Sequence, residues 1–223
     1  MLRLLFFLII IKPLAILVLG LNIRRHELLP ASGPAIVVAN HNSHLDTLVL
    51  MSLFPLRLIA KVHPVAAADY FLRNRWLSWF ARNVIGIIPL ERKPSAKGAQ
   101  VLAPVTKALA RGDILILFPE GSRGEPEKMS KFKNGIAHLL SEQTTVAVTP
   151  VFFYGLGKSL PKGELFLVPF FVDVFVGEPL AWNGARQAFM EALESSMQQL
   201  QYQAQIATRH AQEPPPQTQP NKE

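Results

Sequence analysis

Cysteine is absent from all 223 residues of the chain, and its absence excludes several chemistries. The chain can form no disulfide, which is compatible with a reducing compartment. It also offers no thiolate nucleophile, so an acyl-enzyme route through cysteine is excluded. Any metal site would have to be built without thiolate ligands.

Acidic residues are also scarce, since 16 Asp and Glu stand against 23 Lys and Arg and leave a net charge of +7. In a chain with 49% hydrophobic residues, this basic charge favours an anionic membrane surface over a nucleic acid as the partner. No zinc-finger, ribonucleoprotein-type or basic-zipper pattern is present, so we expect no nucleic acid. The length fits one domain with a substantial core.

The amino-terminal segment lacks an uninterrupted apolar run long enough to span a bilayer. Residues 2–21 are apolar except for Arg3 and Lys12, and Pro13 follows Lys12. The segment approaches the ~20 residues that a spanning helix needs, but a lysine near the centre costs roughly 2.5–3.5 kcal/mol on insertion. We therefore expect a retained membrane anchor over residues 1–25, with two short helices broken at Pro13 and Lys12 reaching the headgroups. A spanning form of the segment remains an alternative.

Two further features indicate how the chain is organised. Arg24 and Arg25 stand where a secretory signal peptide would need a small-residue cleavage site, so we expect them at the cytoplasmic headgroups of a membrane. The tail over residues 213–223 combines consecutive prolines with Gln, Asn and Lys, which predicts disorder. A single domain then occupies residues 26–212.

Apolar runs alternate with helical patterns along this domain. We expect strands over residues 36–39, 86–90, 114–118 and 146–153, with a further strand or hairpin over 165–176. We expect helices from Ser43 and over residues 66–82, 97–111, 132–142 and 187–210. Strand followed by helix, repeated, predicts an α/β fold with a mostly parallel central sheet flanked by helices, preceded by the apolar membrane-associating helical segment.

Two of these elements have an ambiguous placement. Pro150 interrupts the strand over residues 146–153, so we expect that strand at an edge or with a bulge. The helix over residues 66–82 interleaves aromatic and basic side chains, and would either face a membrane or pack in the core.

The sequence Asn-His-Asn-Ser-His-Leu-Asp over residues 40–46 gathers polar groups between a buried strand and a helix. Ser43 and Asp46 form a capping-box-like start, with Ser43 as N-cap and Asp46 at the third helical position. Because helical side chains lean toward the N-terminus, Asp46 should point back toward His41. A carboxylate that holds one imidazole nitrogen leaves the other as a base, suited to a substrate hydroxyl.

The same cluster permits two other interpretations. It could only cap the helix and close a loop. It could also hold a metal through His41, His44 and Asp46, but the spacing His-x-x-His-x-Asp matches no known template and no cysteine adds a ligand. A metal-dependent esterase is therefore kept only as an alternative, and we expect no metal.

A second polar turn, Phe-Pro-Glu-Gly-Ser-Arg-Gly over residues 118–124, follows the predicted strand 114–118. Open α/β sheets bind ligands at the carboxyl ends of their strands. The arginine and the turn amides could hold a phosphate. Gly135 at a helix start would let a phosphate or another backbone come close.

These motifs together carry a family resemblance. His41-x4-Asp46, Gly86 to Arg92, the turn from Phe118 to Arg123 and Val148-Thr149-Pro150-Val151 occur in the order of the motif blocks of the glycerolipid acyltransferases. The chain resembles the bacterial 1-acylglycerol-3-phosphate acyltransferase group over roughly residues 30–180. The ordered set is far more specific than any one block.

The resemblance implies a reaction and roles for two residues. A fatty acyl group would move from acyl-CoA or acyl carrier protein to the free hydroxyl of a lysophospholipid, most directly 1-acylglycerol-3-phosphate. His41 would be the general base and Asp46 would orient its ring, so the hydroxyl attacks directly and no cofactor is needed. The implied partners are membrane lipids, the lysophospholipid acceptor and the thioester donor.

The resemblance also implies a set of substrate-binding residues: Arg92, Glu120, Gly121, Ser122, Arg123, Lys133 and Pro150. Arg92 is expected to bind the acceptor's phosphate, and Lys133 is a further phosphate candidate. An ionised Glu120 only accepts hydrogen bonds, so we expect it to hold Arg123, Arg92 or a glycerol hydroxyl. Pro150 belongs to the block that the family associates with the acyl donor.

The chain departs from the family pattern in two places. Ser122 stands where threonine is commoner, and Lys61-Val62-His63-Pro64 replaces a Lys-x-Glu-Leu segment. Because that segment lies where the acceptor and acyl chain enter, lyso-ornithine lipid and glycerol 3-phosphate remain alternative acceptors. A non-catalytic membrane lipid-binding protein is the alternative of another class, and an intact His41/Asp46 pair argues against it.

Overall fold

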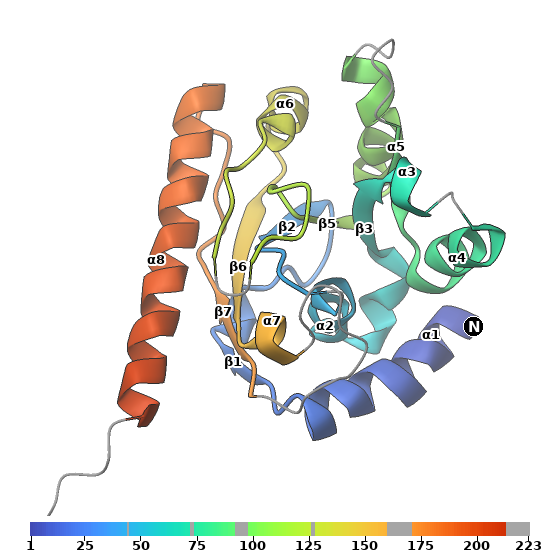
Figure 1. Cartoon of the computed structure of the whole chain (residues 1–223). Helices are drawn as coiled ribbons and strands as arrows, with labels where there is room; N and C mark the ends of the chain where they lie inside the picture. The colour runs from blue at the N-terminus through green and yellow to red at the C-terminus, as the bar shows by residue number, and fades with distance from the viewer. Residues whose placement is uncertain (44, 72–73, 92–97, 126–127, 160–170, 213–223) are drawn as a thin grey trace, which may run out of the picture.

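The computed structural model describes residues 1–43, 45–71, 74–91, 98–125, 128–159 and 171–212 (Figure 1). Its strands form one sheet in the order β1-β7-β6-β2-β5-β3-β4. Every neighbouring pair is parallel except β6 with β7. The predicted α/β fold with a mostly parallel sheet is confirmed.

The strands are β1 Asn22–Arg24, β2 Ala35–Ala39, β3 Val62–Ala67, β4 Ile88–Leu90, β5 Ile114–Leu117, β6 Val148–Tyr154 and β7 Asp173–Val176. The α-helices are α1 Leu2–Phe6, α2 Asp46–Ser52, α3 Ala68–Phe71, α4 Arg75–Phe80, α5 Gly98–Ala110, α6 Gly135–Glu142, α7 Leu156–Ser159 and α8 Arg186–Gln212. Shorter π or 3-10 turns are η1 Phe7–Ile11, η2 Leu14–Val18, η3 His26–Leu28, η4 Leu56–Lys61 and η5 Ala81–Ile85.

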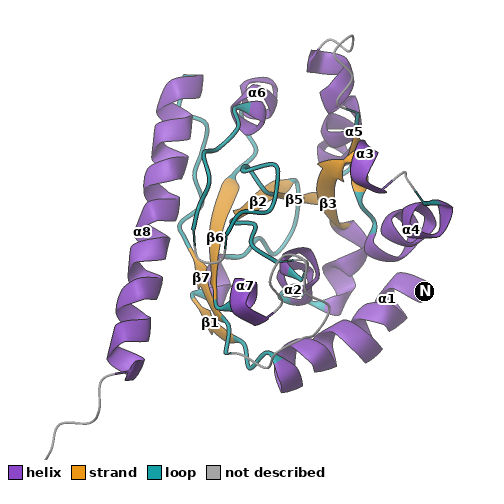
Figure 2. Ribbon diagram, viewed as in Figure 1, coloured by secondary structure: helices purple, strands orange, loops and turns teal. Residues whose placement is uncertain are grey.

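Each face of the sheet carries its own layer of helices (Figure 2). Successive residues of a strand point to opposite faces, so Val37 and Ala39 pack with α2 and the amino-terminal helix, whereas Ile36 and Val38 pack with α5, α6 and α8. All five residues of β2 are buried, as expected for a central parallel strand covered on both sides. The turn that follows β2 therefore leaves the middle of the sheet, where α/β folds place ligands.

The amino-terminal segment is one continuous helix from Leu2 to Val18, so the predicted break at Pro13 is wrong. Pro13 has a helical φ of −60°, and the π-helical turns η1 and η2 on either side accommodate its missing amide. Lys12 was expected at the headgroups, but its Nζ donates to the carbonyl oxygen of Ser52 at 3.0 Å. Within the described residues, no helix combines the length and hydropathy needed to cross a membrane.

The predicted helix over residues 66–82 is wrong in its first part, because Val62–Ala67 form β3 between β4 and β5. The helical pattern beyond it is interrupted at Asn74, whose side chain accepts hydrogen bonds from the amides of Trp76 and Leu77 and starts α4. Pairing with two neighbouring strands outweighs the local helical pattern here.

The strand that contains Pro150 lies inside the sheet, so the expectation of an edge strand is wrong, and the extra residue of the pairing lies in the segment after β7 and not in β6 itself. β6 bonds to β7 at Val151 and to Leu180 at Val148, and the partner segment is one residue longer between these points. The Pro150 carbonyl oxygen faces this bulge and accepts from the amide of Gly177 at 2.8 Å. The missing amide of Pro150 therefore costs no bond to β2.

The carboxyl-terminal expectations fall partly within the described residues. The helix predicted over residues 187–210 is α8. Only the end of the strand predicted over residues 165–176 is described, as β7. Residues 165–170 and the tail 213–223 lie outside the described residues.

Candidate active site

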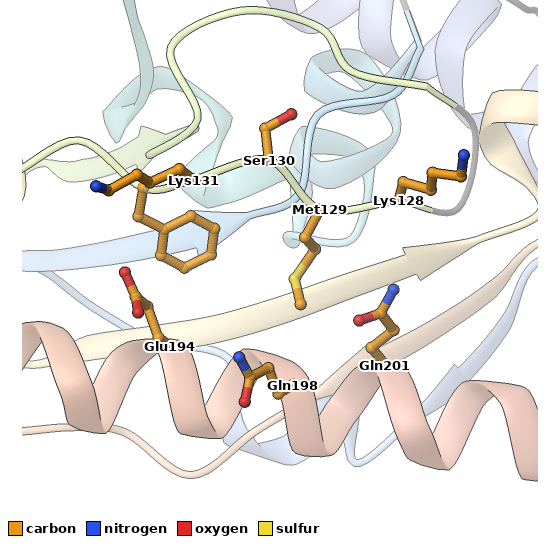
Figure 3. Close-up of a pocket in the computed structure, with 8 residues that line it drawn as sticks. Lys128, Met129, Ser130, Lys131, Glu194, Gln198 and Gln201 are labelled. Atoms are coloured by element: carbon orange, nitrogen blue, oxygen red, sulfur yellow. The ribbon is translucent and has the colours of Figure 1, made fainter.

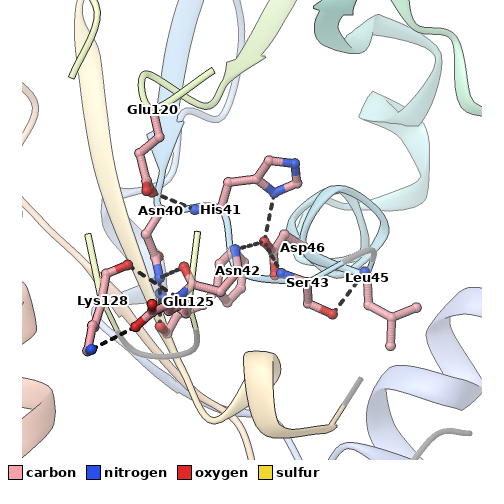
Figure 4. A network of polar contacts seen from close by, with 10 residues as sticks. Asn40, His41, Asn42, Ser43, Leu45, Asp46, Glu120, Glu125 and Lys128 are labelled. Carbon is pink, nitrogen blue, oxygen red and sulfur yellow. Dashed lines mark hydrogen bonds and ion pairs between the residues drawn. The ribbon is translucent and has the colours of Figure 1, made fainter. Parts of the chain in front are cut away.

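His41 is the second residue after β2, and its ring is held by Asp46 at the start of α2 (Figure 4). The His41 Nδ1 lies 2.9 Å from the Asp46 Oδ2, and Asp46 is 1% exposed. A carboxylate accepts hydrogen bonds, so Nδ1 carries the proton and donates it. The other nitrogen, Nε2, is left with its lone pair, and Figure 4 shows it pointing away from Asp46.

The Asp46 carboxylate is itself fixed by the main chain that precedes it. Its Oδ2 accepts from the amides of Asn42 at 2.6 Å and Ser43 at 2.9 Å, besides the imidazole. The bond to Ser43 is the reach-back that the sequence predicted. The helix itself begins at Asp46 with Leu45 as its N-cap, so the predicted N-cap at Ser43 is wrong.

Two neighbours of His41 that sequence reasoning gave no role also position it. Phe118 stacks on the imidazole with ring centroids 4.2 Å apart and an interplanar angle of 23°. Asn40 is 1% exposed, and its amide bonds to both the N–H and the carbonyl of Phe153, at 2.7 and 3.0 Å. The side chain of Asn40 thereby continues the ladder between β2 and β6 past the end of β2.

Asn42 extends this network to the far side of the site. Its Oδ1 accepts from the Asn40 Nδ2 at 3.1 Å, and its Nδ2 donates to the carbonyl of Glu125 at 2.5 Å. The only sequence signal for these roles was an asparagine on each side of His41 at a strand end. Their partners lie 113 and 83 residues away in the chain, which no local pattern reveals.

The main chain of His41 is held by the turn that follows β5. The His41 amide donates to the Glu120 Oε1 at 2.8 Å, and the His41 carbonyl accepts from the amide of Gly124 at 2.9 Å. The Glu120 Oε2 accepts from the amide of Ser130 at 2.8 Å. Burial raises the pKa of the Glu120 carboxyl, and the hydrogen bonds from Ser130 and His41 act against that rise.

A cavity of about 520 Å³ opens beside the imidazole. Its polar lining comes from His41 and the turn over residues 121–123, which we call the polar end, and from Thr47 and Asp69. Most of the remaining wall is apolar and comes from α2, β3, η5, β4, α5 and β5: Leu48, Val65, Ala66, Ala67, Ile85, Ile87, Leu90, Val101 and Leu117. The arrangement suits a molecule with a polar head and a long apolar chain.

Lys133 does not line this cavity, but it packs against Gly121, which does. Gly121 has φ +72°, which favours glycine, and a Cβ there would lie 2.6 Å from the Lys133 Nζ, so the lysine side chain would have to shift. The amide of Lys133 donates to the carbonyl of Pro119 at 2.9 Å. A cationic amine thus stands beside a turn whose residues 121–123 line the cavity.

The structure does not bring every predicted site residue to this cavity. Glu120 is 3% exposed and does not line it. Pro150 lies in register with Val38 inside the sheet and does not line it either. Arg92 lies outside the described residues.

A second cavity of about 490 Å³ lies between residues 128–132 and α8 (Figure 3). Its wall is mostly polar: Lys128, Ser130, Lys131, Glu194, Gln198 and Gln201, with Met129 and Phe132. It holds no histidine and shares no lining residue with the cavity of His41, so the base chemistry belongs to the first cavity. The described residues contain no group of three or more histidine or carboxylate side chains placed to hold a metal ion, and His44 lies outside them.

The imidazole of His41 stands at the carboxyl edge of a mostly parallel sheet, beside a cavity with both polar and apolar lining residues. Such a lining suits an amphiphilic molecule. Residues 20–154 match the family model described as Acyltransferase, which covers more than half of the chain. The chain therefore belongs to the acyltransferase family.

Curated relatives match about two thirds or more of the chain. The chloroplastic 1-acyl-sn-glycerol-3-phosphate acyltransferase LPAT1 of Arabidopsis thaliana is 33% identical over 150 residues, or 65% of this chain and 38% of that protein. The 1-acyl-sn-glycerol-3-phosphate acyltransferase alpha of Mus musculus is 30% identical over 172 residues, or 75% of this chain and 57% of that protein. The matched part thus spans from about two fifths to under three fifths of these relatives.

A solved structure has the same fold. The crystal structure of the 1-acyl-sn-glycerophosphate acyltransferase PlsC from Thermotoga maritima superposes with a TM-score of 0.68, covering 87% of this chain and 78% of that one. The identity is 19%, so this likeness bears on the fold alone.

Proposed function

We propose that this chain transfers a fatty acyl group from an acyl-CoA or acyl carrier protein thioester to the free hydroxyl of 1-acylglycerol-3-phosphate, giving phosphatidic acid. The observation that carries the proposal is the His41 ring, held through Nδ1 by a buried Asp46 while Nε2 is left as a base. Family membership and the names of the curated relatives support the same reaction.

The proposed mechanism is a direct transfer of the acyl group from the thioester to the acceptor hydroxyl. The His41 Nε2 takes the acceptor's hydroxyl proton as its oxygen attacks the thioester carbonyl carbon. Collapse of the tetrahedral intermediate breaks the carbon–sulfur bond, and the imidazolium returns the proton to the leaving thiolate. Asp46 stabilises the imidazolium and holds its orientation. A positioned base of this kind contributes roughly 10²–10⁴-fold in rate.

The cavity supports a placement for both ends of the acceptor. We propose that Arg123, Lys133 and the amides of Gly121 and Ser122 bind the phosphate, together with Arg92. The apolar wall beyond them would take an acyl chain. With the phosphate and the acyl chain placed in this way, the free hydroxyl of the acceptor would reach His41 from the polar end of the cavity.

A broad apolar surface supports membrane association. The amino-terminal helix buries one stripe, Phe7, Ile11, Ala15 and Leu19, and exposes most of its other side chains. Its Phe6 meets Phe80 edge-on at 5.3 Å, which places α4 beside it (Figure 1). The exposed large apolar residues on these two elements are Leu2, Leu4, Leu5, Leu8, Ile9, Ile10, Ile16, Leu17, Trp76, Leu77 and Trp79.

Single exposed apolar residues are normal on the surface of a monomer, whereas a large apolar patch marks an interaction site. Tryptophan favours the membrane interface, and Arg75 and Arg82 beside it are exposed and would meet anionic headgroups. We propose that this surface lies on the cytoplasmic face of a bacterial inner membrane. The active-site cavity then receives its lipid from the bilayer.

Acylation by the purified, detergent-solubilised protein tests the function. Labelled acyl-CoA and acyl carrier protein are each offered with lysophosphatidate, glycerol 3-phosphate and lyso-ornithine lipid, with wild type beside His41→Ala. We expect transfer to lysophosphatidate that vanishes in the variant. Transfer only to another acceptor would overturn the substrate, and transfer to no acceptor by folded wild type would favour a lipid-binding protein. Loss of transfer on adding a chelator would favour the metal-dependent alternative.

A further inference from the structure

We propose that Glu120 is a positioning residue, which fixes the main chain of His41 and ties it to residues 128–133, and that it does not bind the acceptor. This inference rests on the proposed function, because acyl transfer is its principal readout. The sequence led us to expect that Glu120 holds Arg123, Arg92 or a glycerol hydroxyl, and only the last of these would be a contact with the acceptor.

The surroundings of the Glu120 carboxylate carry the inference. Each oxygen accepts a backbone amide at 2.8 Å, from His41 at Oε1 and from Ser130 at Oε2. The residue is 3% exposed and does not line the cavity of His41, although Gly121, which follows it, does. Hydrogen bonds to an ionised carboxylate are stronger than neutral ones, so a substrate hydroxyl would have to reach a buried group that is already engaged.

The bond to the His41 amide matters because it completes the support of the base. The ring is held by Asp46, the carbonyl by Gly124 and the amide by Glu120, as the dashed lines in Figure 4 show for the first and last of these. The position of Nε2 follows the main chain as well as the ring. A displacement of about 1 Å at a reacting group can cost on the order of 10²-fold in rate.

The bond to the Ser130 amide extends this support to the phosphate end of the cavity. Ser130 belongs to the segment that carries Lys133 over Gly121. One buried carboxylate therefore connects the strand end that bears the base to the segment that bears a cation. Figure 3 shows the outer side of this segment, where its side chains line the second cavity against α8.

Glu120→Gln tests the inference with a residue of nearly the same shape. Its amide keeps one acceptor oxygen but turns an NH₂ group toward the other backbone N–H. We expect kcat to fall on the order of 10²-fold while the KM for the acceptor stays within about twofold, because substrate contacts are unchanged. The thermal midpoint of each variant is measured alongside.

Glu125→Gln is the matched control. It makes the same chemical change five residues along the chain, where the carboxylate is exposed and pairs only with Lys128 among the described contacts. The carbonyl that accepts from Asn42 is main chain and remains in place. We expect wild-type kcat and KM.

Two kinetic results would overturn the inference: a raised KM for the acceptor with kcat retained, or no change in either constant. If Glu120→Gln does not fold, Glu120→Asp replaces it. The shorter side chain keeps its charge but cannot span both amides, and the same separation of kcat from KM is expected.

If the proposed function fails, the positioning role of Glu120 can still be tested by a second measurement. Hydrogen–deuterium exchange at the His41 amide, the Ser130 amide or both should be faster in Glu120→Gln than in wild type, and unchanged at both in Glu125→Gln, whatever the substrate. Unchanged exchange at both amides in Glu120→Gln would contradict the positioning role even in a protein that transfers no acyl group.

Discussion

His41 and His63 each lie near an aspartate, but they differ in their place in the sheet and in their hydrogen-bond partners. His41 follows the carboxyl end of β2, whereas His63 lies near the amino end of β3. The His63 Nδ1 lies 2.8 Å from the carbonyl oxygen of Gly86, and its Nε2 lies 3.9 Å from the Asp113 Oδ2, beyond hydrogen-bond length. The Asp113 carboxylate is held instead by Arg111, at 2.7 and 3.2 Å.

The charges around His63 oppose its use as a base. Burial lowers the pKa of its imidazole, and the cations Arg3 and Arg111 lower it further, against the Gly86 carbonyl and Asp113. Arg3 is itself buried, which lowers its pKa to about 10, and it reaches this region from the amino-terminal helix by donating to the carbonyl of Val62. His63 also lines neither described cavity.

The comparison separates two histidine–carboxylate pairs, of which we propose that only the pair of His41 supplies a base. At His41 the carboxylate binds Nδ1 directly and is fixed by two backbone amides, so the lone pair of Nε2 is available beside a cavity. At His63 a carbonyl engages one nitrogen, and the carboxylate belongs mainly to an arginine. What decides the function is which nitrogen each acceptor engages and what the other nitrogen faces.

The largest expected effect comes from replacing the two histidines separately. His41→Ala should lower kcat by roughly 10²–10⁴-fold, because the base is removed. His63→Gln should keep kcat within a few-fold and should lower the thermal midpoint. Steady-state acylation and a thermal melt check both. Equal losses of kcat in the two variants would break the comparison.

Replacing the two aspartates sharpens the same comparison. Asp46→Asn should cost on the order of 10²–10⁴-fold in kcat, because the amide can stabilise the wrong tautomer and cannot balance an imidazolium. Asp113→Asn should instead lower stability, because Arg111 loses its charged partner. Kinetics at saturating acceptor together with urea unfolding distinguish these outcomes. A stable but inactive Asp113→Asn would contradict the structural role of that pair.

The pH dependence of stability should come from His63. Because burial lowers the pKa of His63 below the ordinary histidine value of 6.5, the unfolded chain binds this proton more readily than the folded one. Its contribution is therefore present above about pH 6.5 and declines as the pH falls below it. We expect His63→Gln to flatten the free energy of unfolding against pH in that range. An unchanged slope in urea titrations would oppose this assignment.

The smallest expected effects come from a glycine beside each histidine. Gly121 and Gly86 both have positive φ, and a Cβ would meet Lys133 at the first and Arg3 at the second. Either Gly→Ala change should cost about 1–2 kcal/mol of stability from the left-handed conformation alone. Gly121→Ala should also raise the KM for a phosphate-bearing acceptor by displacing Lys133, whereas Gly86→Ala should not. A raised KM in both would show that the two regions are coupled.

Local sequence patterns predicted the elements that depend on near neighbours. The alternation of apolar runs with helical patterns predicted the α/β sheet, and the capping-box spacing predicted that Asp46 reaches back to His41. Their contact is confirmed, and the catalytic role remains a prediction. The apolar periodicity also predicted α8 within a few residues.

Contacts between distant parts of the chain account for the rest. The strand over Val62–Ala67 depends on pairing with β4 and β5, and the interior position of Pro150 depends on a bulge against the segment after β7. The clamp from Asn40 to Phe153 and the bond from Glu120 to the His41 amide join residues 113 and 79 positions apart. No spacing rule within a window of the sequence reports such partners.

The central claim is that His41 activates the acceptor for direct attack, so the acyl group never resides on the protein. The most direct measurement mixes wild-type protein with labelled acyl donor in the absence of acceptor, quenches the mixture and determines the mass of the protein. The account predicts an unmodified mass, with the label moving to lysophosphatidate only after that acceptor is added. An acyl-protein adduct that forms as fast as turnover and passes its label to the acceptor would contradict it.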